Sequence, residues 1–198
     1  MIKYKGQQTT DPLPHDIFID ILADLRQRGD LTTHTICMLM GIRALRISDV
    51  LSLSVESCFF STGKLRPYIK NFTSIKQKKK ITIPLNPKNQ DSYFVRMFEM
   101  YWHLICERDP ASNLFEGATT PVLSQSVVKQ RLKRYRNDFN IQCSPHSFRK
   151  HACREMFNNK VPISVIMKYL GHSSPDITLR YISVNSQDIE QAIDSINF

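Results

Sequence analysis

The sequence has few of the features that mark secreted or membrane-bound proteins. Its five cysteines are odd in number and none stands in a CxxC pair, which indicates a reducing compartment rather than a disulfide framework. The longest apolar stretch, around Ile36 to Ile42, is too short to cross a membrane, and no apolar signal segment follows Met1. We therefore expect a cytoplasmic protein that has no membrane partner.

Metal-binding patterns are also scarce. The nearest approach to one is a group of two cysteines and two histidines, namely Cys143, His146, His151 and Cys153. Their spacing matches no common zinc site, and a cluster of carboxylates is missing as well. We expect no metal, and we expect Cys37 and Cys106, in apolar helical surroundings, to behave as small hydrophobic residues.

What the sequence does have is positive charge. Lys and Arg number 27 against 18 Asp and Glu, so the formal net charge is +9. The excess is concentrated in residues 76–80 and 129–136, and such basic surfaces favour polyanions. The candidate nucleic-acid contacts are Lys78, Lys79, Lys80, Lys129, Arg131, Lys133 and Arg134.

Apolar spacing predicts a mainly α-helical protein with a small antiparallel β-hairpin. Ile17, Ile21 and Leu25 form one helical stripe after Pro14. Further helices are expected over 32–42, 46–53, 93–106, 124–139 and 186–198, and helices are expected to begin at Pro145 and Pro175, each after a capping serine. The composition is 41% apolar and no linker is evident, so residues 1–198 are expected to form one domain.

The pattern changes to that of strands within residues 59–85. Two short strands are expected, over 64–72 and 75–84, and Ile81, Thr82 and Ile83 show the alternation of a half-buried strand. A small hairpin that carries Lys76 and the following lysines results.

Several polar residues stand at spacings that suggest a common site. Arg46 and Asp49 are three apart and share a helix face, His146 and Arg149 open a helix, and Tyr181 follows His172 by nine positions. A phenol has a pKa near 10, so a nucleophilic tyrosine needs cationic neighbours that stabilise the group it attacks. Taken singly, each residue has an ordinary alternative role, such as a surface ion pair or a half-buried core tyrosine.

In this order and spacing, the residues resemble the catalytic domain of the tyrosine recombinase, or phage integrase, family. The resemblance runs from about residue 11 to 185. It implies that Arg46 and Arg149 grip a scissile DNA phosphate, that His172 adds a donor, and that His146 assists proton transfer. It further implies that Lys76 protonates the leaving 5′ oxygen, that Asp49 orients Arg46 or His146, and that Tyr181 is the nucleophile.

The resemblance also implies an activity and partners. The expected activity is site-specific recombination of double-stranded DNA through a 3′-phosphotyrosyl intermediate and a Holliday junction, with no cofactor. A tetramer on paired sites would form through the helix over 186–198, whose apolar stripe is Ile189, Ala192, Ile193 and Ile196. Accessory DNA-bending proteins are further candidate partners, and the protein would associate with the nucleoid when it binds DNA.

The sequence departs from the family pattern at two places. Arg43 and Ala44 stand where a Thr-Gly pair is usual, and Asp49 stands where a glutamate is usual, but neither change removes a reacting group. The N-terminal DNA-binding domain of typical members is expected to be absent, which suits either an excised domain or a short stand-alone recombinase. A type IB topoisomerase and a non-catalytic DNA-binding regulator derived from a recombinase remain alternatives.

Overall fold

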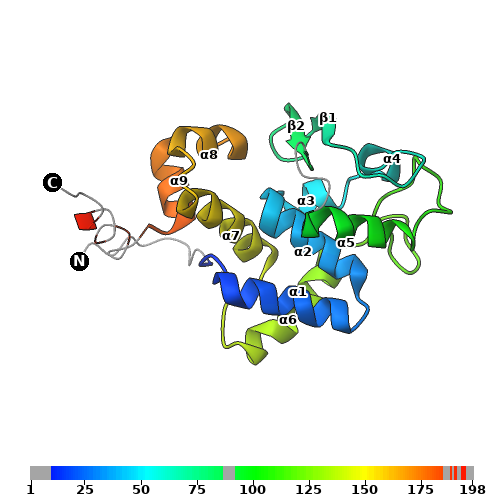
Figure 1. The fold of residues 1–198 in the computed structure, drawn as a ribbon, viewed down its shortest axis with the longest axis horizontal. Coiled ribbons are helices and arrows are strands. Elements are labelled where there is room, and N and C mark those ends of the chain that lie inside the picture. Colours follow the sequence, from blue (N-terminus) through cyan, green and yellow to red (C-terminus); the bar gives the residue numbers. More distant parts are fainter. Residues whose placement is uncertain (1–9, 87–91, 185–187, 189, 191–192, 195–198) are drawn as a thin grey trace. The chain divides into compact units, whose positions relative to one another are not determined.

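The computed structural model describes residues 10–86, 92–184, 188, 190, 193 and 194 (Figure 1). The chain forms two compact units, residues 1–152 and 153–198. The first unit contains α1 (His15–Gln27), α2 (Leu31–Arg43), α3 (Ile47–Val50), α4 (Val55–Cys58), β1 (Tyr68–Thr73), β2 (Lys80–Pro84), α5 (Tyr93–Trp102), α6 (Gln125–Asp138) and the start of α7 (Pro145–Asn158). The second contains the end of α7, α8 (Ile163–Leu170) and α9 (Pro175–Ile182). The predicted mainly helical fold with a small hairpin is confirmed.

Helix α2 is the central element of the first unit. It is buried from Thr33 to Gly41 and contacts α1, α3 and α5. Asp30 caps its start by accepting a hydrogen bond from the Thr33 N–H. Gly41 allows α1 to approach closely, because a Cβ atom at this position would lie 2.3 Å from Cε2 of Phe18. The helix ends at Ala44, whose φ of 50° is left-handed.

Helix α3 is shorter than the sequence suggests. A helix is expected over 46–53, but the structure confines it to Ile47–Val50. Arg46 is the extended N-cap residue rather than a residue within the helix. Ala44 has a left-handed backbone conformation and Arg46 an extended one, so Arg46 lies immediately before the first residue of α3.

The hairpin is also shorter than expected. Strands β1 and β2 pair antiparallel, with Ile69 opposite Ile83 and Thr73 opposite Lys80. Ile69 and Ile83 are buried and fix the hairpin on the core. Residues 75–79, which were expected to begin the second strand, instead form the turn between the strands. Lys76 therefore lies on this turn and is exposed.

The two proline-containing helix starts are confirmed, with one difference between them. Ser144 precedes α7 and its Oγ accepts a hydrogen bond from the Ser147 N–H. Ser174 is the N-cap residue of α9, but its side chain makes no capping hydrogen bond. Pro175 at the first helical position therefore marks this start without help from the serine.

The second unit is built around a few buried apolar side chains, among them Ile166, Leu170 and Ile182. Helix α8 ends at Gly171, whose φ of 69° suits a residue without a side chain. Of the expected terminal stripe, Ile189, Ala192 and Ile196 lie outside the described residues, and Ile193 is 61% exposed.

Two further expectations can be compared with the structure. Cys37 is buried as expected, whereas Cys106 is exposed, because α5 ends at Trp102 instead of continuing through it. Among the helices in the described part of the chain, none combines the length and the apolar character that a membrane span needs.

Candidate active site

Three of the predicted site residues meet in one pocket of the first unit. Arg46 comes from the N-cap of α3, and His146 and Arg149 come from the first turn and a half of α7. All three line a pocket of about 240 Å³, together with Ile47, Gln125, Lys129, Ser144 and Pro145. We call the group of Arg46, His146 and Arg149 the cationic clamp. Segments about a hundred residues apart in sequence thus build one concave cationic site.

The clamp arginines differ in exposure. Arg149 is only 6% exposed, whereas the Arg46 side chain is about one-fifth exposed at the rim. A guanidinium group stays charged at any physiological pH and offers donors in a planar fork. Two such groups around a small pocket are suited to hold the oxygens of a phosphate.

His146 carries a lowered pKa in this setting. Burial lowers its pKa below the ordinary value of 6.5, and four nearby positive charges lower it further. These charges belong to Lys150, Arg149, Lys76 and Arg46. The imidazole is therefore neutral near pH 7 and can accept a proton. The same interactions place Lys76 of the hairpin turn within electrostatic reach of the clamp.

Asp49 links the clamp to the hairpin. Its carboxylate is almost fully buried, and Oδ2 lies 3.9 Å from Nη1 of Arg46. Oδ1 accepts a hydrogen bond of 2.9 Å from the Ile75 N–H, and the Ser74 hydroxyl donates to both oxygens. The expected contact with Arg46 is present, and the contacts with the hairpin are an addition that the sequence does not reveal.

The second unit brings His172 and Tyr181 together. Their ring centroids are 5.2 Å apart in an edge-to-face arrangement. Nδ1 of His172 also lies 3.0 Å from Oγ1 of Thr178, a fully buried residue one helical turn before Tyr181. The candidate nucleophile and its histidine neighbour thus lie side by side, with His172 in the segment before α9 and Tyr181 near the end of that helix.

The chain matches the model of the phage integrase family over residues 14–188. It belongs to the phage integrase family. Among curated relatives, it is 24% identical over 199 residues to tyrosine recombinase XerA of Pyrococcus horikoshii, covering 97% of this chain and 65% of the relative. It is 24% identical over 165 residues to transposase B from transposon PsiTn554 of Staphylococcus aureus, covering 79% of this chain and 25% of the relative. The chain thus spans about two thirds and one quarter of these relatives.

Solved structures of two recombinases and an integrase share the fold. The crystal structure of XerA recombinase matches with a TM-score of 0.74 at 16% identity, over 98% of this chain and 67% of that chain. XerH site-specific recombinase bound to palindromic difH substrate matches with a TM-score of 0.71 at 14% identity, over 95% and 54%. A lambda integrase dimer bound to a COC' core site matches with a TM-score of 0.63 at 16% identity, over 90% and 61%.

Those predicted DNA-contact residues that lie on α6 separate into two sets. Lys129 lines the clamp pocket, and it also lines a neighbouring pocket of about 330 Å³ with Lys133 and Arg136. Arg131 instead donates to Thr33 Oγ1 at 2.9 Å and pairs with Asp30. The spacing of 129, 133 and 136 is that of one helix face, so Arg136 could have been found from the sequence.

Arg134, like Arg131, pairs with acidic side chains, whereas Lys133 lines the basic pocket. Its guanidinium lies 4.0 Å from Asp24 and 3.9 Å from Asp138. Asp24 also accepts a hydrogen bond of 2.6 Å from the Tyr135 hydroxyl, and burial raises the pKa of Tyr135 above its usual range. This side of α6 is therefore tied to α1 through Asp24.

The hairpin lysines lie on the hairpin as expected, although two of them stand in its turn rather than in its second strand. Lys78 and Lys79 stand in the turn and Lys80 begins β2, and all three are exposed. Lys78 has a left-handed φ of 55°. Sequence reasoning missed three residues at the site, namely Lys150, Ser74 and Thr178. Each is buried: Ser74 and Thr178 hydrogen-bond Asp49 and His172, respectively, and the charge of Lys150 lowers the pKa of His146. Such contacts leave no motif in the sequence.

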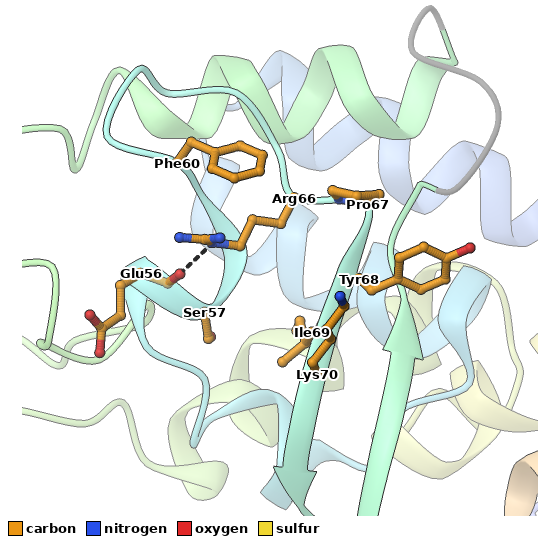
Figure 2. Close-up of a pocket in the computed structure, with 8 residues that line it drawn as sticks. All are labelled: Glu56, Ser57, Phe60, Arg66, Pro67, Tyr68, Ile69 and Lys70. Atoms are coloured by element: carbon orange, nitrogen blue, oxygen red, sulfur yellow. Dashed lines mark hydrogen bonds between the residues drawn. The ribbon is translucent and has the colours of Figure 1, made fainter.

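A larger pocket of about 600 Å³ lies apart from the clamp, beside α4 and β1 (Figure 2). The Arg66 guanidinium lies 4.4 Å from the centroid of the Phe60 ring, and its Nε donates to the Glu56 carbonyl at 2.8 Å. Tyr68 and Lys70 of β1 also line it. The clamp residues and Lys76 do not line this pocket.

Proposed function

We propose that this chain is the catalytic part of a site-specific DNA recombinase that cuts and rejoins DNA through a 3′-phosphotyrosyl intermediate. The observation that carries the proposal is the clamp pocket, in which two arginines and a neutral histidine from distant segments converge. A pocket of this kind holds a phosphate by preorganised charge. The side-by-side arrangement of His172 and Tyr181 adds the nucleophile.

In the proposed reaction, the Tyr181 oxygen forms a bond to phosphorus while the bond from phosphorus to the 5′ oxygen breaks. The phenolic proton passes to His146, whose lowered pKa keeps it unprotonated beforehand. Arg46, Arg149 and His172 stabilise the charge on the non-bridging oxygens of the pentacoordinate phosphorus. This chemistry requires Tyr181 to reach the phosphate that the clamp holds.

Lys76 supplies the proton for the leaving 5′ oxygen. It stands on the exposed hairpin turn, and its charge acts on His146 of the clamp. The reverse step, in which a 5′ hydroxyl attacks the phosphotyrosine, restores the phosphodiester. Because the covalent intermediate conserves the energy of the broken bond, the reaction needs no metal and no nucleotide cofactor.

Double-stranded DNA is the proposed partner. Lys129, Lys133 and Arg136 continue the basic lining from the clamp along α6, and the hairpin lysines 78–80 add charge beside Lys76. The matching structures of XerH and lambda integrase are bound to a palindromic difH substrate and to a COC' core site, respectively. The protein would therefore act where its DNA lies, in the cytoplasm at the nucleoid.

Assembly is a further part of the proposal. Four copies on two DNA sites, joined through residues 186–198 and aided by DNA-bending proteins, would allow exchange of one strand pair at a time through a Holliday junction. Ile193 of the apolar stripe is exposed in the single chain, which is expected of a residue that an interface with another copy would bury. Deleting residues 187–198 should abolish pairing of two sites in light scattering and leave single-site binding intact.

The named relatives favour recombination over the two alternatives, since they are tyrosine recombinases and a transposase rather than topoisomerases or regulators. The experiment that tests the proposal uses a nicked duplex built from the DNA that flanks the coding sequence. Cleavage near the nick releases a short strand that carries the 5′ hydroxyl. Without this hydroxyl the reverse step cannot occur, and the covalent complex is trapped. A band that survives denaturation supports the proposal, and its absence across all flanking sequences argues against it.

A further inference from the structure

Ser74 stands at the base of the turn that carries Lys76, and it is fully buried. Its hydroxyl lies 3.3 Å from Oδ1 and 3.2 Å from Oδ2 of Asp49, and donates to this carboxylate. The next residue, Ile75, donates its N–H to Oδ1 at 2.9 Å. Two consecutive donors from the hairpin therefore satisfy one buried carboxylate.

The backbone of Ser74 also closes the turn. Its N–H donates to the Lys79 carbonyl at 3.0 Å, and its carbonyl accepts from the Lys78 N–H at 2.9 Å. Lys78 takes the left-handed φ that this closure needs. All the polar groups of Ser74 are thus engaged at the base of the turn, while Lys76 at its tip is exposed.

Asp49 joins this turn to the clamp. It lies on α3, whose N-cap is Arg46, and its Oδ2 is 3.9 Å from Nη1 of that arginine. A buried carboxylate needs hydrogen-bond donors, because desolvation penalises its charge. Charge-assisted hydrogen bonds of this kind are stronger than neutral ones and fix geometry more tightly. The position of the turn relative to Arg46 is therefore set through Asp49.

We propose that Ser74 is a positioning residue for Lys76. Its hydroxyl, held by Asp49, fixes the base of the turn so that the lysine is presented at a set place beside the clamp. The inference rests on the proposed function, in which Lys76 protonates the leaving 5′ oxygen. Ser74 itself would touch neither DNA nor the reacting atoms.

The test compares Ser74→Ala with Ser52→Ala. Ser52 is the matched control, because its hydroxyl donates to the main-chain carbonyl of Asp49, at 2.9 Å, rather than to the carboxylate. Cleavage of the nicked flanking-DNA duplex is measured with an ordinary phosphodiester and with a 5′-bridging phosphorothiolate, whose thiolate leaves without a proton. Amide hydrogen exchange of residues 75–79 is measured on the same proteins without DNA.

We expect Ser74→Ala to slow cleavage of the ordinary duplex by about tenfold to a hundredfold, as a small misplacement of a reacting group does. DNA affinity should stay unchanged, the phosphorothiolate should restore the rate, and exchange at residues 75–79 should quicken. Ser52→Ala should match the wild type in all of these. A substitution that only loosened the fold would slow both substrates equally.

Three results would overturn the inference. One is equal cleavage by the Ser74 and Ser52 variants, and another is a Ser74→Ala defect that the phosphorothiolate leaves in place. The third is unchanged hydrogen exchange in the turn. A wild-type protein that cleaves no flanking duplex would instead contradict the proposed function, and the exchange comparison would still decide whether the Ser74 hydroxyl holds the turn.

Discussion

Nδ1 of His172 lies 3.0 Å from Oγ1 of Thr178, one helical turn before Tyr181. Because Thr178 is fully buried, its hydroxyl holds Nδ1 of the histidine in place and so sets the orientation of the ring. In metal sites and catalytic sites alike, the partner of one imidazole nitrogen fixes the orientation of the other.

This contact gives a first prediction. Thr178→Val keeps the side-chain shape but removes the hydroxyl, so it should lower the rate of covalent adduct formation by roughly tenfold, the equivalent of one hydrogen bond. Thr178→Ser restores the hydroxyl and should retain most of the rate. The measurement is single-turnover cleavage of the nicked duplex. A valine variant as fast as the wild type would show that Thr178 does not orient His172.

The clamp arginines should act on the reaction more than on binding. Arg46→Ala and Arg149→Ala each remove a preorganised charge from the pocket, and cleavage should fall by about a hundredfold to a thousandfold. DNA affinity, measured by fluorescence anisotropy, should fall much less. Arg131→Ala is the control, because Arg131 pairs with Asp30 and Thr33 outside the pocket. Equal losses of affinity and rate would indicate that the arginines only anchor DNA.

The two faces of α6 should differ in their salt dependence. Lys133 lines a basic pocket, so Lys133→Ala should weaken binding and reduce the slope of log affinity against log salt by roughly one. Arg131→Ala should leave the slope unchanged and lower the midpoint of thermal unfolding instead, because it breaks contacts with α2. If Arg131→Ala changed the salt slope and Lys133→Ala only lowered the unfolding midpoint, DNA would contact the face of α6 that carries Arg131.

The lowered pKa of His146 predicts an acid limb in the pH–rate profile. Burial first, and then the neighbouring positive charges, keep the pKa below 6.5, so the imidazole accepts the phenolic proton at pH 7. The second-order cleavage rate should therefore fall only below pH 6.5. His146→Gln should be slower and should lack this limb. A wild-type limb centred above pH 6.5 would contradict the assignment.

The same shift affects stability. His146 binds its proton more weakly when folded than when unfolded, so its contribution to stability is fully present above pH 6.5. That contribution is lost as the pH falls through the lowered folded pKa. His146→Gln should remove this part of the pH dependence of the free energy of unfolding.

Part of the site could be predicted from sequence because its residues belong to ordered motifs. His146 and Arg149 follow a serine–proline helix start, and His172 follows the glycine that ends α8. Such signals are local, since capping and left-handed glycine depend on a few neighbouring residues. The fold class followed from apolar periodicity in the same way.

The remaining features depend on contacts between distant segments. Residues 75–79 resemble the start of a strand, yet Asp49 from another segment accepts the Ile75 N–H and a turn forms instead. On α6, periodicity separates the two faces but cannot reveal that Asp24 and Asp30 lie opposite one of them. Cys106 likewise continues the apolar pattern of α5, although the helix ends at Trp102.

The central claim is that Tyr181 becomes covalently joined to DNA. The most direct measurement traps the adduct on the nicked flanking duplex, digests it, and locates the DNA-linked peptide by mass spectrometry. Tyr169→Phe is the matched control, because Tyr169 on α8 is a partly exposed tyrosine of the same unit, as Tyr181 is on α9. We expect the link at Tyr181, no adduct from Tyr181→Phe despite nearly unchanged binding, and a normal adduct from Tyr169→Phe. An adduct from Tyr181→Phe that survives denaturation, or a link mapped to another residue, would contradict the account.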